Sequence, residues 1–341
     1  MICVEYLRCT VLIVLTMNIC AQKTKSDTML NAKNVNGPLQ NIQKTQSIKQ
    51  ETSLNSNDKN IMELNAYNSV TLLPNRSVCG LLSDEERIFG GESTDIDEFP
   101  WLARIKYVLD SGKEVYACAG SLITQNYVLT AAHCVVNLTI KEVRLGDWNT
   151  ETETDCQGRV CSDPAVDVSV SQVKIFPEYR KSDTFKGDVA LLRLQKPIYY
   201  SDFVRPICLP ITDDTIRQDN SSKSIYWTAG WGKTENENKA NIKQKLAISA
   251  VPIGDCRNKQ PIITDKTAPF VICAGGVAGK DTCVGDSGGS LVKQMTINKT
   301  TNWFLVGVTS YGYRFCGSEG RPGLYARITP LLHWILNNIE D

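Results

Sequence analysis

From residue 88 onward, the chain consists of short apolar runs separated by Gly, Pro, Asn and Asp. The clearest runs are residues 115–123, 127–131, 189–194, 225–229, 304–308 and 324–328. Many short strands with frequent turn residues are typical of an antiparallel barrel or sandwich. The segments between the runs lack the 3.6-residue apolar spacing of an amphipathic helix, which disfavours a parallel α/β fold. We therefore expect an all-β domain.

The clearest helix is the last element of the chain. Thr329 can cap this helix, and Pro330 fits its first turn. An apolar stripe at helical spacing is formed by Leu331, Leu332, Ile335, Leu336 and Ile339.

Composition limits the partners. The 341 residues are 42% hydrophobic and 22% charged, which is enough apolar material for a sizeable core. The chain has 37 basic and 37 acidic residues, so its formal net charge is zero. No strong overall field draws such a chain to phosphate backbones or anionic lipid, so we expect neither a nucleic-acid nor a membrane partner.

Residues 1–20 have the layout of a secretory signal peptide. Arg8 precedes an apolar run at residues 11–15, and the small residue Ala21 follows the segment. The apolar stretch is shorter than the roughly 20 residues that a membrane helix needs, and Asn18 interrupts it. We expect a secreted, extracellular protein.

The cysteines agree with secretion. Thirteen cysteines beside two histidines indicate disulfides in an oxidising compartment rather than zinc sites. Cleavage after residue 20 removes Cys3, Cys9 and Cys20 and leaves ten, which can all pair.

Residues 21–87 are predicted to be a flexible pro-segment and activation linker. Residues 22–77 are rich in Asn, Gln, Lys, Ser and Thr and show no sustained strand or helix period. Such a segment cannot bury enough apolar surface to offset its ordering entropy. A partner-binding arm is the alternative.

Three motifs suggest nucleophilic catalysis. His133 follows an apolar run, Asp188 precedes one, and Ser287 lies in the glycine-rich turn Gly-Asp-Ser-Gly-Gly. A serine hydroxyl is a weak nucleophile unless a nearby base takes its proton and a buried acid orients that base. The surrounding glycines allow the N–H groups of Gly285 and Ser287 to point at a developing oxyanion.

Residues 88–341 resemble the chymotrypsin-type (trypsin-like) serine protease family, which has the same order of histidine, aspartate and serine. The resemblance implies a serine endopeptidase with two antiparallel six-stranded β-barrels and a C-terminal helix, requiring no cofactor for catalysis. His133 and Asp188 would lie on the first barrel and Ser287 on the second.

The resemblance also implies a specificity pocket. Asp281 would lie at its bottom, Gly312 and Gly323 in its walls, and Ser310 beside Asp188 and the substrate backbone. A buried carboxylate without a fixed partner is costly, so the pocket gains by accepting a guanidinium or ammonium group. Cleavage after Arg or Lys follows. The alternative is that Asp281 is a solvated loop acid.

The sequence around Arg87 and Ile88 resembles the family's activation junction. It implies a zymogen that is cut between these residues, after which the new amine of Ile88 pairs with Asp286. Arg87 before the cut implies an upstream activating protease that is itself trypsin-like, and self-activation is also possible.

Five disulfides are implied by the same resemblance. They are Cys79–Cys208, Cys118–Cys134, Cys156–Cys161, Cys256–Cys273 and Cys283–Cys316. The Cys156–Cys161 bridge resembles one in arthropod clip-domain proteases of haemolymph cascades. A clip domain needs six cysteines of its own, and residues 22–78 contain none.

This branch of the family implies limited proteolysis of protein substrates in an immune or developmental cascade, with serpin-type inhibitors. A digestive or venom protease is the alternative. A non-catalytic homologue is disfavoured because His133 and Ser287 are both present.

Two further kinds of site are expected. A structural calcium site, similar to the calcium loop of clip-domain proteases, would use Asp147, Asn149, Thr152 and Asp155. A solvated acidic loop is the alternative. Sequons for glycosylation begin at Asn75, Asn137, Asn220 and Asn298.

Overall fold

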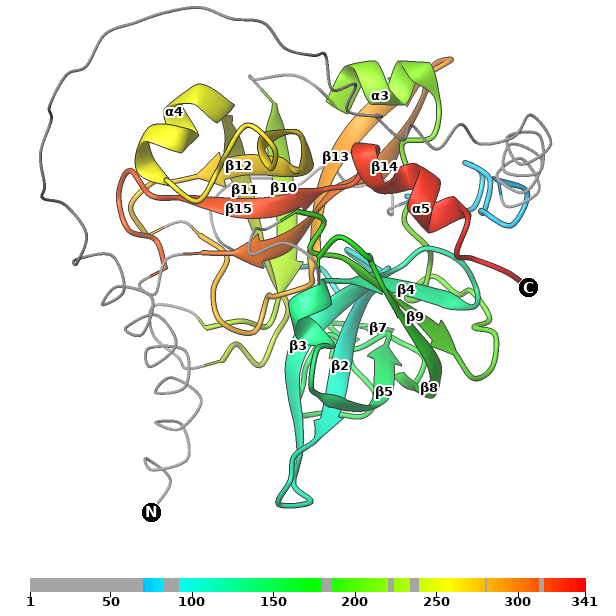
Figure 1. Ribbon diagram of the computed structural model, residues 1–341. Helices are drawn as coiled ribbons and strands as arrows, with labels where there is room; N and C mark the ends of the chain where they lie inside the picture. Colours follow the sequence, from blue (N-terminus) through cyan, green and yellow to red (C-terminus); the bar gives the residue numbers. More distant parts are fainter. Residues whose placement is uncertain are drawn as a thin grey trace, which may run out of the picture. The chain divides into compact units, whose positions relative to one another are not determined.

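A computed structural model describes residues 70–81, 92–179, 186–219, 224–233, 239–279, 281–312 and 316–341 (Figure 1). The expected signal peptide, most of the expected pro-segment, the Arg87–Ile88 junction and Asn220 lie outside the described residues. No helix within the described ranges is long and apolar enough to cross a membrane.

The first barrel is closed by six antiparallel strands in the order β2-β3-β4-β9-β8-β5. Its strands are β2 (Leu102–Val108), β3 (Glu114–Leu122), β4 (Tyr127–Thr130), β5 (Thr139–Leu145), β8 (Val166–Ile175) and β9 (Ala190–Leu194). Large side chains such as Trp101, Tyr107 and Leu191 fill its core. The 3-10 turn η1 (Ala132–Cys134) follows β4 directly.

The second barrel is formed by strands in the order β11-β10-β13-β14-β15-β12, and pairing of β11 with β12 closes it. Its strands are β10 (Ile225–Gly230), β11 (Gln244–Val251), β12 (Val271–Gly275), β13 (Ser290–Ile297), β14 (Thr300–Tyr311) and β15 (Pro322–Arg327). The short strand β1 (Glu92–Ser93) pairs with β11. The expectation of two six-stranded antiparallel barrels is therefore confirmed.

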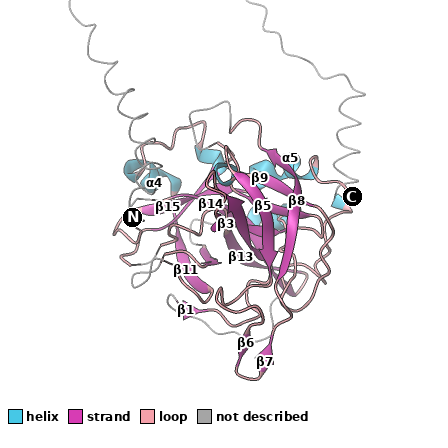
Figure 2. Ribbon diagram, turned by 90° about the horizontal axis from the view of Figure 1, so that it is seen from below, coloured by secondary structure: helices cyan, strands magenta, loops and turns pink. Residues whose placement is uncertain are grey.

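Few other elements accompany the barrels. They are the hairpin β6 (Cys156–Gln157) and β7 (Val160–Cys161), the helices α3 (Asp213–Asp219), α4 (Ile253–Lys259) and α5 (Leu332–Leu336), and the 3-10 turns η2 (Ala268–Phe270) and η3 (Thr329–Leu331). Figure 2 shows the β6–β7 hairpin projecting from the barrels.

The C-terminal helix is shorter than predicted. Thr329 and Pro330 lie in η3, where the Leu331 N–H donates to the Ile328 carbonyl at 2.8 Å, and α5 begins only at Leu332. Thr329 is therefore not the cap of α5. The predicted apolar stripe is nevertheless buried and joins a core cluster that contains residues of both barrels.

Residues 70–81, which belong to the segment 21–87 that was expected to be flexible, are held against β14. Cys79 forms a disulfide with Cys208, and Gly80 accepts a hydrogen bond from the Trp303 N–H at 2.9 Å. The Arg76 guanidinium donates to Asn302 Oδ1 at 3.0 Å. A disulfide and main-chain hydrogen bonds fix this segment, so it shows no apolar period in the sequence.

All five expected disulfides are present: Cys79–Cys208, Cys118–Cys134, Cys156–Cys161, Cys256–Cys273 and Cys283–Cys316. Cys118–Cys134 joins β3 to η1, and Cys283–Cys316 joins the segments that lead into β13 and β15.

Gly187 is required where the chain enters β9. Its φ is 69°, and a Cβ there would lie 2.5 Å from Cε1 of the Phe176 ring. That ring is buried and makes an edge contact with Trp334, so it cannot easily move aside. Gly187 thereby sets the backbone that carries Asp188.

We predict that Gly187→Ala destabilises the fold by about 2 to 4 kcal/mol, because a left-handed alanine and an overpacked ring add their costs. Gly112→Ala is the matched control, since Gly112 has φ of 78° but open space around its Cβ position. Urea unfolding should show a clearly smaller loss for the control. Equal losses would show that the Phe176 contact does not matter.

Candidate active site

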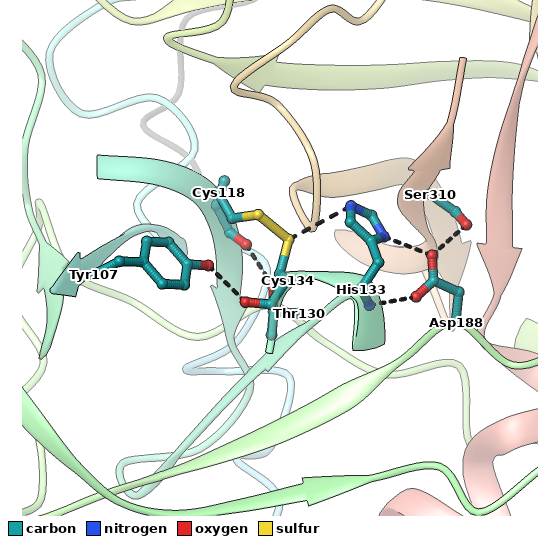
Figure 3. The surroundings of a disulfide bond; sticks show 8 residues. Tyr107, Cys118, Thr130, His133, Cys134, Asp188 and Ser310 are labelled. Carbon is teal, nitrogen blue, oxygen red and sulfur yellow. Dashed lines mark hydrogen bonds and ion pairs between the residues drawn. A yellow bond between two sulfur atoms is a disulfide. The ribbon is translucent and has the colours of Figure 1, made fainter. Parts of the chain in front are cut away.

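Strand pairing brings the histidine and its acid together. β4 pairs with β9, with Thr130 opposite Ala190, so η1 and the residue before β9 become neighbours. His133 Nδ1 lies 2.8 Å from Asp188 Oδ2, and the His133 main-chain N–H donates to Asp188 Oδ1 at 2.9 Å (Figure 3). Because a carboxylate only accepts, Nδ1 carries a proton and Nε2 is left free to act as a base.

Ser310 reaches Asp188 from the other barrel. Its hydroxyl, at the end of β14, donates to Asp188 Oδ2 at 2.5 Å. Asp188 is only 1% exposed, so its carboxylate depends on these donors in place of water. Ser310 lies beside Asp188, where the family resemblance placed it.

The loop before β13 brings Ser287 to the same place. The Ser287 carbonyl accepts a hydrogen bond from the Ala119 N–H at 2.8 Å, one residue beyond the Cys118–Cys134 disulfide. Gly288 has φ of 79°, and a Cβ there would collide with Thr130 Oγ1 and the Ala119 carbonyl. Glycine at this position therefore lets the loop approach β3 and β4 closely.

The Ser287 hydroxyl and the His133 ring are not hydrogen-bonded to each other in this structure. The His133 Nε2 atom instead lies 3.7 Å from Cys134 Sγ. Catalytic hydrogen bonds are often loose without substrate and tighten only in the reacting complex.

Two amide groups beside Ser287 are available to an oxyanion. Within the described part of the chain, the N–H groups of Gly285 and Ser287 donate to no backbone carbonyl. Gly285 has φ of 107°, and a Cβ there would lie 3.0 Å from the Gly232 Cα atom. A side chain at Gly285 would therefore crowd this part of the loop.

Asp281 presents an unpaired oxygen. Its Oδ2 atom accepts a long hydrogen bond from the Gly317 N–H, at 3.4 Å, while Oδ1 is buried without a partner among the residues that the structure describes. Burial raises the pKa of Asp281. A Cβ on Gly323 would lie 3.2 Å from Oδ1, and Gly312 has open space around it. These observations disfavour a solvated loop acid.

Tyr325, a supporting residue near Asp281, was not identified from the sequence. The hydroxyls of Thr282 and Tyr325 share a hydrogen bond of 3.1 Å. The ring edge of Tyr325 also lies 3.3 Å from a Cβ built on Gly323. Tyr325 belongs to an ordinary apolar strand pattern, so no local signal marked it.

Asp286 is a second acid in the same loop and is half-buried. It accepts hydrogen bonds from the N–H groups of Gly232 at 2.8 Å and Cys283 at 3.0 Å. Burial raises its pKa to about 6. A Cβ on Gly230 or Gly232 would overlap the carboxylate, so this glycine pair makes room for it. We did not single out the pair from the sequence, although its Gly-Trp-Gly spacing is visible there.

Comparison with known proteins identifies this arrangement. The sequence model of the family described as Trypsin matches residues 88–335, well over half of the chain. The chain belongs to the trypsin family.

Individual relatives agree. CLIP domain-containing serine protease HP8 of Bombyx mori is 43% identical over 281 residues, which cover 80% of this chain and 75% of the relative. Phenoloxidase-activating factor 3 of Holotrichia diomphalia is 40% identical, and the match covers 79% of this chain and 76% of that relative. The crystal structure of the Drosophila Grass clip serine protease of the Toll pathway matches with a TM-score of 0.70 at 30% identity. The match covers 79% of this chain and 77% of that chain. This trypsin-family protein is thus a serine endopeptidase.

The loop expected to bind calcium uses its carboxylates within the protein. Asp155 Oδ2 accepts hydrogen bonds from the N–H groups of Trp148 at 2.7 Å and Asn149 at 3.1 Å, and its Oδ1 accepts one from the Thr152 hydroxyl. Asp147 forms a buried ion pair with Arg104. The Arg104 guanidinium beside Asp147 does not fit a cation site well. Calcium binding therefore stays a prediction, and these contacts do not favour it.

Three of the four sequons can be located on this trypsin-family domain. Asn75, Asn137 and Asn298 are all exposed. Asn137 and Asn298 have left-handed backbone, with φ of 56° and 51°, as asparagine in a tight turn often has. Glycosylation of Asn75, Asn137, Asn220 and Asn298 stays a prediction.

The raised pKa of Asp286 predicts a pH dependence of the uncut protein. The folded state holds this proton more tightly than the unfolded state, so the stabilisation is complete below about pH 4 and is lost as pH rises through about 6. In an Arg87→Gln background, Asp286→Asn should therefore reduce the fall in unfolding free energy between pH 4 and pH 7 by about 3 kcal/mol.

Asp110→Asn, which removes an exposed carboxylate, is the control for this measurement. Urea unfolding at both pH values gives the change for each variant. An unchanged pH slope in Asp286→Asn would show that Asp286 is already ionised in the uncut protein.

Proposed function

We propose that this chain is a secreted zymogen whose activated form cleaves protein substrates after Arg or Lys. The unpaired, buried Oδ1 atom of Asp281 carries the specificity. An acceptor left without a partner at the bottom of a pocket favours a cationic side chain that can donate to it. Secretion is supported by the signal-like residues 1–20 and by five disulfides in the described domain.

The proposed reaction has two stages. The Ser287 hydroxyl attacks the substrate carbonyl carbon while His133 Nε2 takes its proton, and Asp188 stabilises the imidazolium. The developing oxyanion accepts hydrogen bonds from the N–H groups of Gly285 and Ser287. His133 then protonates the leaving amine. Water repeats the attack on the acyl ester, releases the acid and returns the proton to Ser287.

Participation in a cascade is the finer part of the proposal. One relative is named a phenoloxidase-activating factor, and a similar solved chain is a Toll pathway protease. A protease of limited specificity in an extracellular cascade, with an upstream activating protease and serpin-type inhibitors, is consistent with both names.

Substitution of Asp281 tests the specificity. Asp281→Ser should lower kcat/KM for arginine peptides by roughly 10² to 10⁴, because an unpaired buried cation costs about 3 to 5 kcal/mol. Cleavage after Phe or Leu should not fall in parallel. Preferred cleavage after Phe or Leu by the wild type would contradict the pocket assignment.

Ser287→Ala should abolish turnover of every substrate without changing the thermal unfolding midpoint by more than a few degrees.

Activation is proposed to occur by one cut between Arg87 and Ile88, which lie outside the described residues. The half-buried Asp286 would then gain a cationic partner in the Ile88 amine, which would order the loop around Gly285 and Ser287. The Arg87→Gln protein should stay uncut and inactive. The heavy chain of active enzyme should begin Ile-Phe-Gly-Gly, and Cys79–Cys208 should hold both chains together until reductant is added. Full activity in an uncut chain would refute this mechanism.

A further inference from the structure

The segment before the proposed activation junction contains another bond after arginine, Arg76–Ser77. Arg76 and Arg87 lie on opposite sides of Cys79, which is bonded to Cys208. A cut after Arg87 leaves the upstream segment attached to the catalytic domain through this disulfide. A cut after Arg76 would release everything before Ser77. The choice between the two bonds therefore decides whether the activated enzyme keeps its upstream segment.

The Arg76 side chain is held by the hairpin of β13 and β14. Its Nε atom donates to Asn302 Oδ1 at 3.0 Å, and its Nη1 atom donates to the Ile297 carbonyl at 3.1 Å. Its Nη2 atom donates to the Thr300 carbonyl. All three nitrogens of the guanidinium are therefore bound in the folded protein. A protease that cuts after arginine must take this group into its specificity pocket, so these bonds must break first.

The carbonyl group of the same bond is also occupied. The Arg76 carbonyl accepts a hydrogen bond from Asn302 Nδ2 at 2.8 Å, and the same nitrogen donates to the Cys79 carbonyl at 3.0 Å. Asn302 is only 1% exposed, so its amide depends on these partners. Hydrolysis of the bond requires the Arg76 carbonyl oxygen to enter an oxyanion hole. Asn302 therefore holds both the side chain and the carbonyl that a protease must bind.

The backbone around the Arg76–Ser77 bond forms a turn. The N–H groups of Val78 and Cys79 donate to the Asn75 carbonyl at 2.9 and 3.0 Å. The Ser77 N–H donates to Asn75 Oδ1 at 3.0 Å. Proteolysis of a folded chain proceeds through a locally opened state. The turn must therefore open, together with the contacts of Arg76, before a protease can reach the bond.

We propose that the contact of Arg76 with Asn302 protects the Arg76–Ser77 bond from proteases that cut after arginine. The upstream segment thereby stays attached to the catalytic domain when the chain is activated. Arginine is needed for this protection, because its rigid fork reaches three acceptors at once, whereas a lysine ammonium is a single point charge on a flexible stem. This inference rests on the proposed activation by a cut after Arg87.

The test compares the rates at which added trypsin cuts the two bonds. The full-length Ser287→Ala chain is used so that it cannot digest itself, and N-linked glycans are removed first because Asn75 begins a sequon. Labelling of new N-termini counts the chains that begin Ser-Val-Cys-Gly and Ile-Phe-Gly-Gly. In the folded protein, the Ile-Phe-Gly-Gly terminus should appear roughly 100-fold faster. In a chain that has been unfolded, reduced and alkylated, both termini should appear at comparable rates.

Variants assign the protection to the two residues. Arg76→Lys keeps a residue that trypsin accepts but loses the guanidinium fork, so the Ser-Val-Cys-Gly terminus should appear roughly tenfold faster or more in the folded protein. Asn302→Ala should have the same effect with arginine still in place. Arg76→Gln is the matched control, because it loosens the segment equally but leaves no bond that trypsin can cut there.

Three outcomes would overturn the inference. They are rapid cleavage after Arg76 in the folded Ser287→Ala chain, an Arg76→Lys chain that is as resistant as that chain, and slow cleavage after Arg76 in the unfolded chain. The last would assign the resistance to the local sequence and not to the fold. The Ile-Phe-Gly-Gly terminus is the internal reference, and its absence from every sample would instead reject activation after Arg87.

Discussion

The buried carboxylate of Asp188 joins the two barrels into one site. It accepts hydrogen bonds from the His133 main chain, the His133 ring and the Ser310 hydroxyl. A charge that has lost its water needs such donors, and here they come from both barrels. The orientation of the imidazole therefore depends on the packing of β14 against the first barrel. The same packing places the loop of Ser287 against β3, through the bond from Ala119.

The other two acids of the site differ from Asp188 because, within the described residues, only backbone N–H groups donate to them. Asp286 is half-buried and accepts from two backbone N–H groups, and Asp281 has one long backbone bond and one oxygen without a partner among the described residues. Burial raises the pKa of both. Each would gain most from a cation that arrives later, a new chain terminus for Asp286 and a substrate side chain for Asp281. Asp188 is thus already satisfied by donors of the protein itself, whereas Asp286 and Asp281 would each gain from an added cation.

Sequence patterns predicted the parts of this molecule that are local. Short apolar runs indicated the strands, and three motifs indicated His133, Asp188 and Ser287. The Cys79–Cys208 disulfide was predicted, but the order of residues 70–81 was not, because main-chain hydrogen bonds such as that from Trp303 to Gly80 leave no apolar pattern. The late start of α5 depends on the tight turn that contains Pro330. Gly230 and Gly232 matter through the space they leave for Asp286, which only the folded chain reveals.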